Sequence, residues 1–226
     1  MVLNKKSSED RAYAEIMAMI LSQEIPPGSV MMEGALAERL QMSRTPVRAA
    51  LRRLVSSGLL EITSNRGASV PILSKKDWDD LFELRLRVEP RIAALAALKY
   101  DGERGAFLRG LVEEEKKDQH EDSLSLQEIN ERLHLGIAEL ADNKYMFMSL
   151  KLVFWRCQLY VCFFDSFLPA AKDRVMDRFE KPYELTSIAQ HERIVDAITS
   201  KDPEQAEEVM KEHILSTYQR STSYSN

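Results

Sequence analysis

The sequence has only two cysteines, Cys157 and Cys162, among its 226 residues. They lie five residues apart, which is the wrong offset for a CxxC motif, and both fall in a strongly apolar stretch. We therefore expect buried free thiols in a protein of the reducing cytoplasm. The sequence also lacks an apolar run near the ~20 residues that span a membrane, and its first residues lack the apolar core of a signal peptide. These absences argue against secreted and membrane proteins, so we expect no membrane partner.

Glycine and strand-like alternation are scarce after Lys75, where apolar residues recur at helical spacing. We therefore predict a mostly α fold, in which an N-terminal winged helix-turn-helix precedes an all-helical bundle of six or seven helices. A short linker around residues 71–74 divides the chain into domains of residues 1–73 and 74–226. The predicted bundle helices cover residues 75–99, 104–120, 126–140, 145–167, 170–178, 184–199 and 203–220.

The winged helix-turn-helix is predicted from residues 31–70. A first short helix ends at a tight connection, and Ser43 is a suitable N-cap for the second helix, with Pro46 in its first turn. Gly58 stands where a helix commonly ends in a left-handed residue. The run Asn65-Arg66-Gly67 is a turn signal between two short alternating segments, which indicates a hairpin.

Two flanking segments complete this domain. Residues 8–22 form an amphipathic pattern and are predicted to be helical, and residues 29–31 form an extended piece that we expect to pair with the hairpin. In the hairpin, Leu60 and Ile62 alternate with polar neighbours, which is the pattern of a half-buried strand. Helix, turn, helix and hairpin in this order are typical of a winged DNA-binding domain.

The second helix carries the chemistry expected of a DNA reader. Arg44 and Arg48 are four residues apart, so they share one face at the end that enters the major groove in this motif. Arginine suits both the acceptor pair of guanine and phosphate oxygens. An arginine-rich amphipathic helix can also be a solvated face, but the flanking short helix and wing favour DNA. The candidate contacts are Ser43, Arg44, Thr45, Arg48, Arg52 and, at the hairpin tip, Arg66.

Charge is unevenly distributed along the chain. The net charge is −5, yet residues 1–74 carry nine Lys and Arg against seven Asp and Glu. The first domain is therefore mildly basic and the remainder is acidic, as expected when only the first domain meets phosphate. One such domain would bind DNA weakly, whereas two on one palindromic operator would bind far better, so we expect a homodimer.

The run ALAERLQMSRTPVRAALRRLVSSGLL, followed by NRGASV, closely resembles the N-terminal domain of the GntR family of bacterial transcription regulators. The resemblance covers about a third of the chain. It implies that Arg44 and Arg48 contact operator bases or nearby phosphates, and that Ser43, Thr45, Arg66 and Gly67 make or permit backbone and wing contacts. The sequence departs from the family at Gly34, where members often carry a polar or basic residue.

Three of the four histidines fall on the inward faces of predicted bundle helices, or beside them. His191 and His213 lie on apolar stripes, and His134 stands next to one, four residues after Asn130. Three inward imidazoles can build a divalent metal site at the centre of a bundle. The alternative for each is a core histidine that is hydrogen-bonded to a neighbour. His120 lies among charged residues and is expected to be solvated.

A second resemblance bears on this choice. The segments around ELR, VEP, Asn130-x-x-x-His134 and Gln190-His191 resemble the helical, FCD-type ligand-binding domain of FadR-like GntR regulators. Members commonly hold a divalent metal through one Asp and three His, with a small organic acid at or beside it. Carried over by position, the ligands are Asn130, His134, His191 and His213, and the metal is zinc or nickel. Asn130 departs from the usual Asp and supplies no charge.

Two arginines are candidates for the effector. A buried carboxylate needs a cation as its partner, and Arg85 fits by the resemblance, although a surface ion pair with Glu83 or Glu89 is an equal alternative. Arg156 lies in the apolar helix VFWRCQLYVCFF and should have a partner. That partner is Asp165, Glu131 or a ligand.

The sequence thus predicts a ligand-responsive transcription regulator rather than an enzyme. It would be a cytoplasmic repressor that binds double-stranded operator DNA as a homodimer and senses a small carboxylic acid. Two other functions stay open. Three histidines around a metal could activate water in a metal-dependent enzyme, and the chain could be an architectural DNA binder without an effector.

Overall fold

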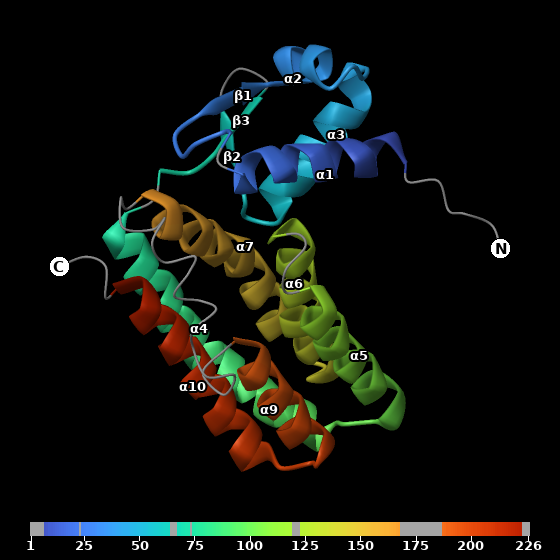
Figure 1. Ribbon diagram of the computed structural model, residues 1–226, viewed down its shortest axis with the longest axis vertical. Coiled ribbons are helices and arrows are strands. Elements are labelled where there is room, and N and C mark those ends of the chain that lie inside the picture. Colours follow the sequence, from blue (N-terminus) through green and yellow to red (C-terminus); the bar gives the residue numbers. More distant parts are fainter. Residues whose placement is uncertain are drawn as a thin grey trace. The chain divides into compact units, whose positions relative to one another are not determined.

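The computed structural model describes residues 7–22, 24–63, 67–72, 74–118, 123–167 and 187–222 (Figure 1). The chain forms two compact units that divide between Lys75 and Lys76. We call the first unit the head and the second the bundle. The division falls two residues from the predicted domain boundary after residue 73.

The head is a winged helix-turn-helix, as predicted. Its three strands form one antiparallel sheet in the order β1-β3-β2, so the extended segment before the first short helix pairs with the hairpin. Helices α1 and α3 pack together and bury Ile16 and Ile20 against a core that includes Leu51 and Leu54. The elements are α1 (Ser8–Leu21), β1 (Val30–Met32), α2 (Glu33–Arg39), α3 (Arg44–Ser56), β2 (Glu61–Thr63) and β3 (Gly67–Ser69).

Two local predictions in the head need correction. Ser43 is the N-cap residue of α3, but its side chain makes no capping hydrogen bond. Ile62 does not share the burial of Leu60, because its side chain is 79% exposed. It lies on the edge strand β2 and lines an open groove beside α3 instead of entering the core. Gly58 follows the end of α3 with a φ of 79°, as the left-handed residue predicted there.

The bundle contains six helices in the part of the chain that the structure describes, and each begins and ends close to its predicted bounds. The predicted helix over residues 170–178 lies outside the described residues. Asp202 caps the last helix, since its carboxylate accepts the backbone N–H of Gln205 at 3.0 Å. The helices are α4 (Lys75–Leu98), α5 (Gly102–Asp118), α6 (Ser123–Leu140), α7 (Lys144–Phe167), α9 (Ser187–Thr199) and α10 (Pro203–Thr222).

The helices of the bundle pack around a core that contains buried histidines and carboxylates. Helices α9 and α10 form an antiparallel hairpin (Figure 1), and α5 packs against both α6 and α9. Cys157 is buried as a free thiol, as predicted, whereas the side chain of Cys162 lies outside the described residues. Among the described helices, we find none with the length and hydropathy needed to cross a bilayer.

Gly67 opens β3 at a point where two strands approach closely. A Cβ atom at this position would lie 2.5 Å from the carbonyl oxygen of Met31, so the backbone would have to shift. We expect Gly67→Ala to lower the free energy of unfolding by about 1–3 kcal/mol. Gly110 in α5 is the matched control, because its Cβ would meet nothing within 4 Å. Gly110→Ala should stabilise the protein by about 0.5–1 kcal/mol, and chemical denaturation that finds the same sign for both variants would contradict this account.

Candidate metal centre and nucleic-acid interface

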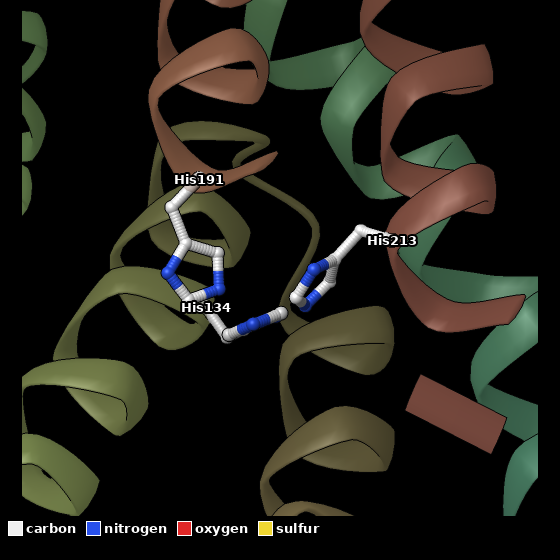
Figure 2. A group of neighbouring side chains, drawn as sticks. All are labelled: His134, His191 and His213. Carbon is white, nitrogen blue, oxygen red and sulfur yellow. The ribbon is translucent and has the colours of Figure 1, made fainter. Parts of the chain in front are cut away.

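Three histidines from three helices meet in the bundle core. His134 comes from α6, His191 from α9 and His213 from α10, and their rings point toward a common centre (Figure 2). One ring nitrogen from each lies within 4.8 Å of the corresponding atoms of the others. All three side chains are buried, with 2%, 2% and 4% of their surface exposed. The structure therefore brings together three of the four predicted ligands, and we call them the histidine cluster.

Each imidazole is held from outside by an oxygen acceptor. The Nδ1 atom of His134 lies 2.6 Å from Glu89 Oε2, and that of His191 lies 2.8 Å from Glu115 Oε2. The Nδ1 atom of His213 lies 2.9 Å from Gln190 Oε1. These partners fix each ring in orientation, an arrangement that also supports metal-binding histidines in proteins.

The protonation state of His134 follows from its surroundings. Glu89 forms a buried ion pair with Arg85, and although burial raises the pKa of the Glu89 carboxyl, Arg85 and His134 together lower it to about 2. An ionised carboxylate can only accept, so Nδ1 of His134 carries the proton. Burial also lowers the pKa of His134, which keeps the ring neutral. Nε2 of His134 therefore presents a lone pair.

The inner nitrogens of the cluster fit a cation. The Nε2 atoms of His134 and His191 are buried and have no hydrogen-bond partner in the described part of the chain. A buried polar atom without a partner is costly, commonly about 1–3 kcal/mol. A core histidine that is merely bonded to a neighbour would explain the Nδ1 contacts, but it leaves these two lone pairs unexplained. Imidazoles from three helices whose ring nitrogens converge are a donor set that zinc and nickel accept.

The fourth predicted ligand stays a prediction. Asn130 lies one turn before His134 on α6 and is half-buried. Its position on the same helical face agrees with the predicted set. An amide oxygen there would add a neutral donor, and the cluster would then hold a divalent ion without any anionic ligand from the protein.

Arg85 lies beside the cluster and not at the surface. Arg85 pairs with Glu89, and both side chains are buried. The predicted alternative of an ion pair with Glu89 is therefore correct in its partner, but the pair lies in the core and not at the surface. The guanidinium also interacts with Cys157, and burial raises the pKa of that thiol to about 11. Because Glu89 contacts both Arg85 and His134, the predicted effector residue is joined to the cluster through a single carboxylate.

Arg156 is half-buried on α7, and its effector role stays a prediction. Of its proposed partners, Glu131 accepts a hydrogen bond from the indole N–H of Trp155 at 2.6 Å, and Asp165 lies outside the described side chains. His120, expected to be solvated, also lies outside the described residues.

Sequence reasoning missed one supporting residue entirely. Glu115 sits in the charged run EEEKK and looks solvated, yet its side chain is buried against His191. The signal was the helical register, because Leu108, Leu111 and Glu115 follow one another at spacings of three and four on the buried face of α5. Gln190 entered the sequence analysis only as part of a motif, and Glu89 only as part of a motif and as a possible surface partner of Arg85.

The exposed face of the head carries the predicted DNA contacts. Ser43, Arg44 and Thr45 are exposed at the start of α3, and the hydroxyl of Ser43 is not used in capping. Arg48 and Arg52 line a groove of about 590 Å³ between α3 and the sheet. Cationic and hydroxyl groups at the N-terminal end of such a helix can meet phosphates and base edges.

The remaining residues of this surface have different roles. Arg53, which also belongs to α3, is engaged inside the head, since it pairs with Asp10 at 3.0 Å and lies 4.0 Å over the ring of Tyr13. Gly67 has a structural reason to be glycine in the close approach described above. Arg66 lies outside the described residues.

Comparison with known proteins matches both units. Residues 80–216 match the family model described as "FCD domain", and residues 8–70 match the model described as "Bacterial regulatory proteins, gntR family". The chain is 24% identical over 208 residues to the HTH-type transcriptional regulator YdhC of Bacillus subtilis, covering 91% of this chain and 85% of that protein.

Two further relatives span nearly the whole chain. A protein of Paenarthrobacter nicotinovorans, named "Probable D-xylose utilization operon transcriptional repressor", is 27% identical over 212 residues, covering 93% of this chain and 87% of that protein. The structure of McbR/YncC from E. coli superposes with a TM-score of 0.72 at 21% identity, covering 98% of this chain and 100% of that one. At this identity the structural likeness establishes the fold alone.

Proposed function

Because the chain belongs to the GntR family of bacterial transcription regulators and carries an FCD domain, we propose that it is a ligand-responsive repressor. It binds a palindromic operator as a homodimer in the cytoplasm and senses a small organic acid held at or beside a divalent metal. The observation that carries the sensory part is the histidine cluster, in which ring nitrogens of all three residues converge in the bundle core and the Nε2 atoms of His134 and His191 have no hydrogen-bond partner in the described residues. The name of the Paenarthrobacter nicotinovorans relative supports repression.

The DNA-binding part rests on α3. Its exposed Arg44 and Arg48 lie four residues apart, and Arg52 continues the same basic surface. In a winged helix-turn-helix this helix enters the major groove, where arginine reads guanine. The two half-sites of a palindrome match the two-fold symmetry of a dimer.

The sensory part rests on charge. Neutral histidines, with Asn130 as a fourth neutral donor, would leave a divalent ion with its full positive charge in the bundle core. An anion then completes the site favourably, because a buried charge requires a partner. A carboxylate from the effector supplies it, and Arg85 is the nearby cation that could bind a second carboxylate oxygen in place of Glu89.

Helix α4 links the two functions along the chain. Glu89 and Arg85 lie on this 24-residue helix, which begins at Lys75, the last residue of the head. Suppose that the contacts among Arg85, Glu89 and His134 have two arrangements, each with its own position of α4. An effector that binds one arrangement more tightly would raise the population of that α4 position. A coupling of 1–3 kcal/mol between effector and operator binding is sufficient for regulation.

The two carboxylates beside the cluster give no support to an enzyme. Glu89 and Glu115 both accept hydrogen bonds from imidazoles, so neither is available to act as a general base on a metal-bound water. The relatives named above are transcription regulators or repressors.

Metal content tests the sensory part of this proposal. Protein purified without a histidine tag is expected to contain close to one zinc or nickel ion per chain by inductively coupled plasma mass spectrometry. A chelated sample should regain the ion on addition of zinc chloride. If neither the purified nor the zinc-treated protein holds metal, the histidine cluster is not a metal site and the effector would be sought at Arg85 and Arg156.

A further inference from the structure

The first two residues of α2 both face arginines of α3. Arg48 donates its Nε–H to Glu33 Oε2 at 2.9 Å, although the two residues are 15 positions apart. Gly34 lies under Arg44, since an ideal Cβ at Gly34 would be 3.5 Å from Nη2, 3.7 Å from Cζ and 3.8 Å from Nε of that side chain. Three atoms of one guanidinium at nearly equal distances from this point place the face of that group over the position of a Cβ at residue 34.

We propose that Glu33 is a positioning residue for sequence readout, which orients Arg48 toward base edges, while Gly34 leaves the space in which Arg44 lies. This inference rests on the proposed use of α3 as the DNA-reading helix. Neither residue needs to touch DNA. Together they form what we call the arginine platform, Glu33 and Gly34.

The geometry of the guanidinium favours this role. Glu33 uses the Nε–H edge of Arg48, so the end formed by the two Nη groups stays available. That end can donate two parallel hydrogen bonds to O6 and N7 of guanine. A long arginine side chain loses rotamer freedom when it binds, and a contact that already limits this freedom reduces the loss.

Stability does not account for the contact. Arg48 keeps 44% of its side-chain surface exposed, and exposed ion pairs contribute little to folding. Glu33 is only 16% exposed and lies in the groove that α3 and the sheet form. A carboxylate on this surface repels DNA phosphates and so weakens binding to any sequence. A carboxylate at Glu33 is useful there if it weakens non-specific binding to DNA and also orients Arg48 for binding to a specific sequence.

The absence of a side chain at Gly34 leaves room for the Arg44 guanidinium. A long polar or basic side chain at position 34 would occupy the space of the Arg44 guanidinium. An alanine Cβ would make only ordinary van der Waals contact, whereas a longer side chain would displace Arg44. In this chain, Arg44 therefore takes the place over the start of α2 that a side chain at position 34 would otherwise fill.

The test uses the full-length protein and two DNA duplexes. The specific probe is a duplex that the parent protein selects from a random-sequence pool, and the reference probe has the same composition in scrambled order. We expect Glu33→Ala to weaken binding to the selected duplex by on the order of 10-fold, within the range of one bidentate arginine–guanine contact. Binding to the scrambled duplex should stay equal or become tighter. Glu33→Gln, which keeps an acceptor for the Nε–H, should retain most of the preference.

A double-variant cycle separates positioning from charge. If Glu33 acts through Arg48, adding Glu33→Ala to the Arg48→Ala variant should not change the preference for the selected duplex over the scrambled one any further. An unchanged preference in Glu33→Ala, or effects that add in the double variant, would overturn the inference. If Arg48→Ala itself keeps the parent preference, the placement of the DNA-reading helix fails as well, which distinguishes the two failures.

Position 34 gives an independent check. Gly34→Ala should keep the preference, whereas Gly34→Leu should reduce it as much as Arg44→Ala does, because the leucine side chain displaces the guanidinium. Both residues favour helix over glycine, so circular dichroism should show an intact head in both variants. If Gly34→Leu prefers the selected duplex over the scrambled one as strongly as the parent does, Gly34 has no role in positioning Arg44.

Discussion

Replacing His191 with alanine is expected to lower the affinity of the protein for zinc by on the order of 10²–10³-fold. Four-ligand structural zinc sites bind with about 10–16 kcal/mol at neutral pH, which is about 2.5–4 kcal/mol for each ligand, and each 1.4 kcal/mol is a factor of ten. The loss should also abolish any effect of organic acids on operator binding. Competition with a fluorescent zinc chelator measures the affinity directly.

Two neighbouring substitutions control this experiment. Arg193→Ala changes an exposed residue of the same helix, which pairs with Glu212 at 3.0 Å, and should leave the zinc affinity unchanged. Glu115→Ala removes the hydrogen-bond partner of His191 and leaves the three histidines in place. It should lower the zinc affinity by about 10–100-fold. Zinc affinity that is the same in His191→Ala and the parent would show that the convergent nitrogens have another purpose.

Replacing Glu89 with glutamine is expected to destabilise the bundle by about 3–5 kcal/mol. The change removes one member of a buried ion pair and leaves the Arg85 guanidinium without a counter-charge in the core. This is a large part of the total stability of an ordinary domain. The free energy of unfolding, measured with urea on metal-free protein, checks the prediction.

The same helix provides a matched control. Glu83 and Arg87 form another i,i+4 pair on α4, with side chains that are 73% and 79% exposed and 4.0 Å apart. Glu83→Gln should not change the unfolding midpoint measurably. The double variant Arg85→Met/Glu89→Gln should recover much of the loss, because it removes the unpaired charge as well. A Glu89→Gln variant as stable as Glu83→Gln would mean that solvent reaches Arg85.

Most of the fold could be predicted because its signals are local. The bounds of α3 follow from Ser43, Gly58 and a regular apolar stripe, and those of α10 follow from Asp202 and the proline after it. The inward positions of His191 and His213 also follow from helical periodicity alone. Such features depend on residues within a few turns of one another, so a single sequence contains them.

What the sequence could not predict depends on contacts between distant segments. Glu33 and Arg48 are ordinary exposed-looking residues until α2 and α3 are placed side by side. Arg85 was equally compatible with a surface pair, and its burial follows from the packing of α4 in the core. Ile62 has an apolar side chain on an edge strand, where nothing in its own neighbourhood determines whether a helix covers it.

The pairing of β1 with β3 has a consequence for how the head opens. Met31, which precedes both helices of the helix-turn-helix, lies opposite Ala68, and β3 is bonded on its other side to β2. The chain between these strands, which contains α2 and α3, is thus closed at both ends by one sheet. Partial opening of α3 or the wing would break that sheet, so the amide protons of these segments should exchange with solvent through a common opening, with one opening free energy. Operator DNA bound at any one of them would slow exchange across the whole head.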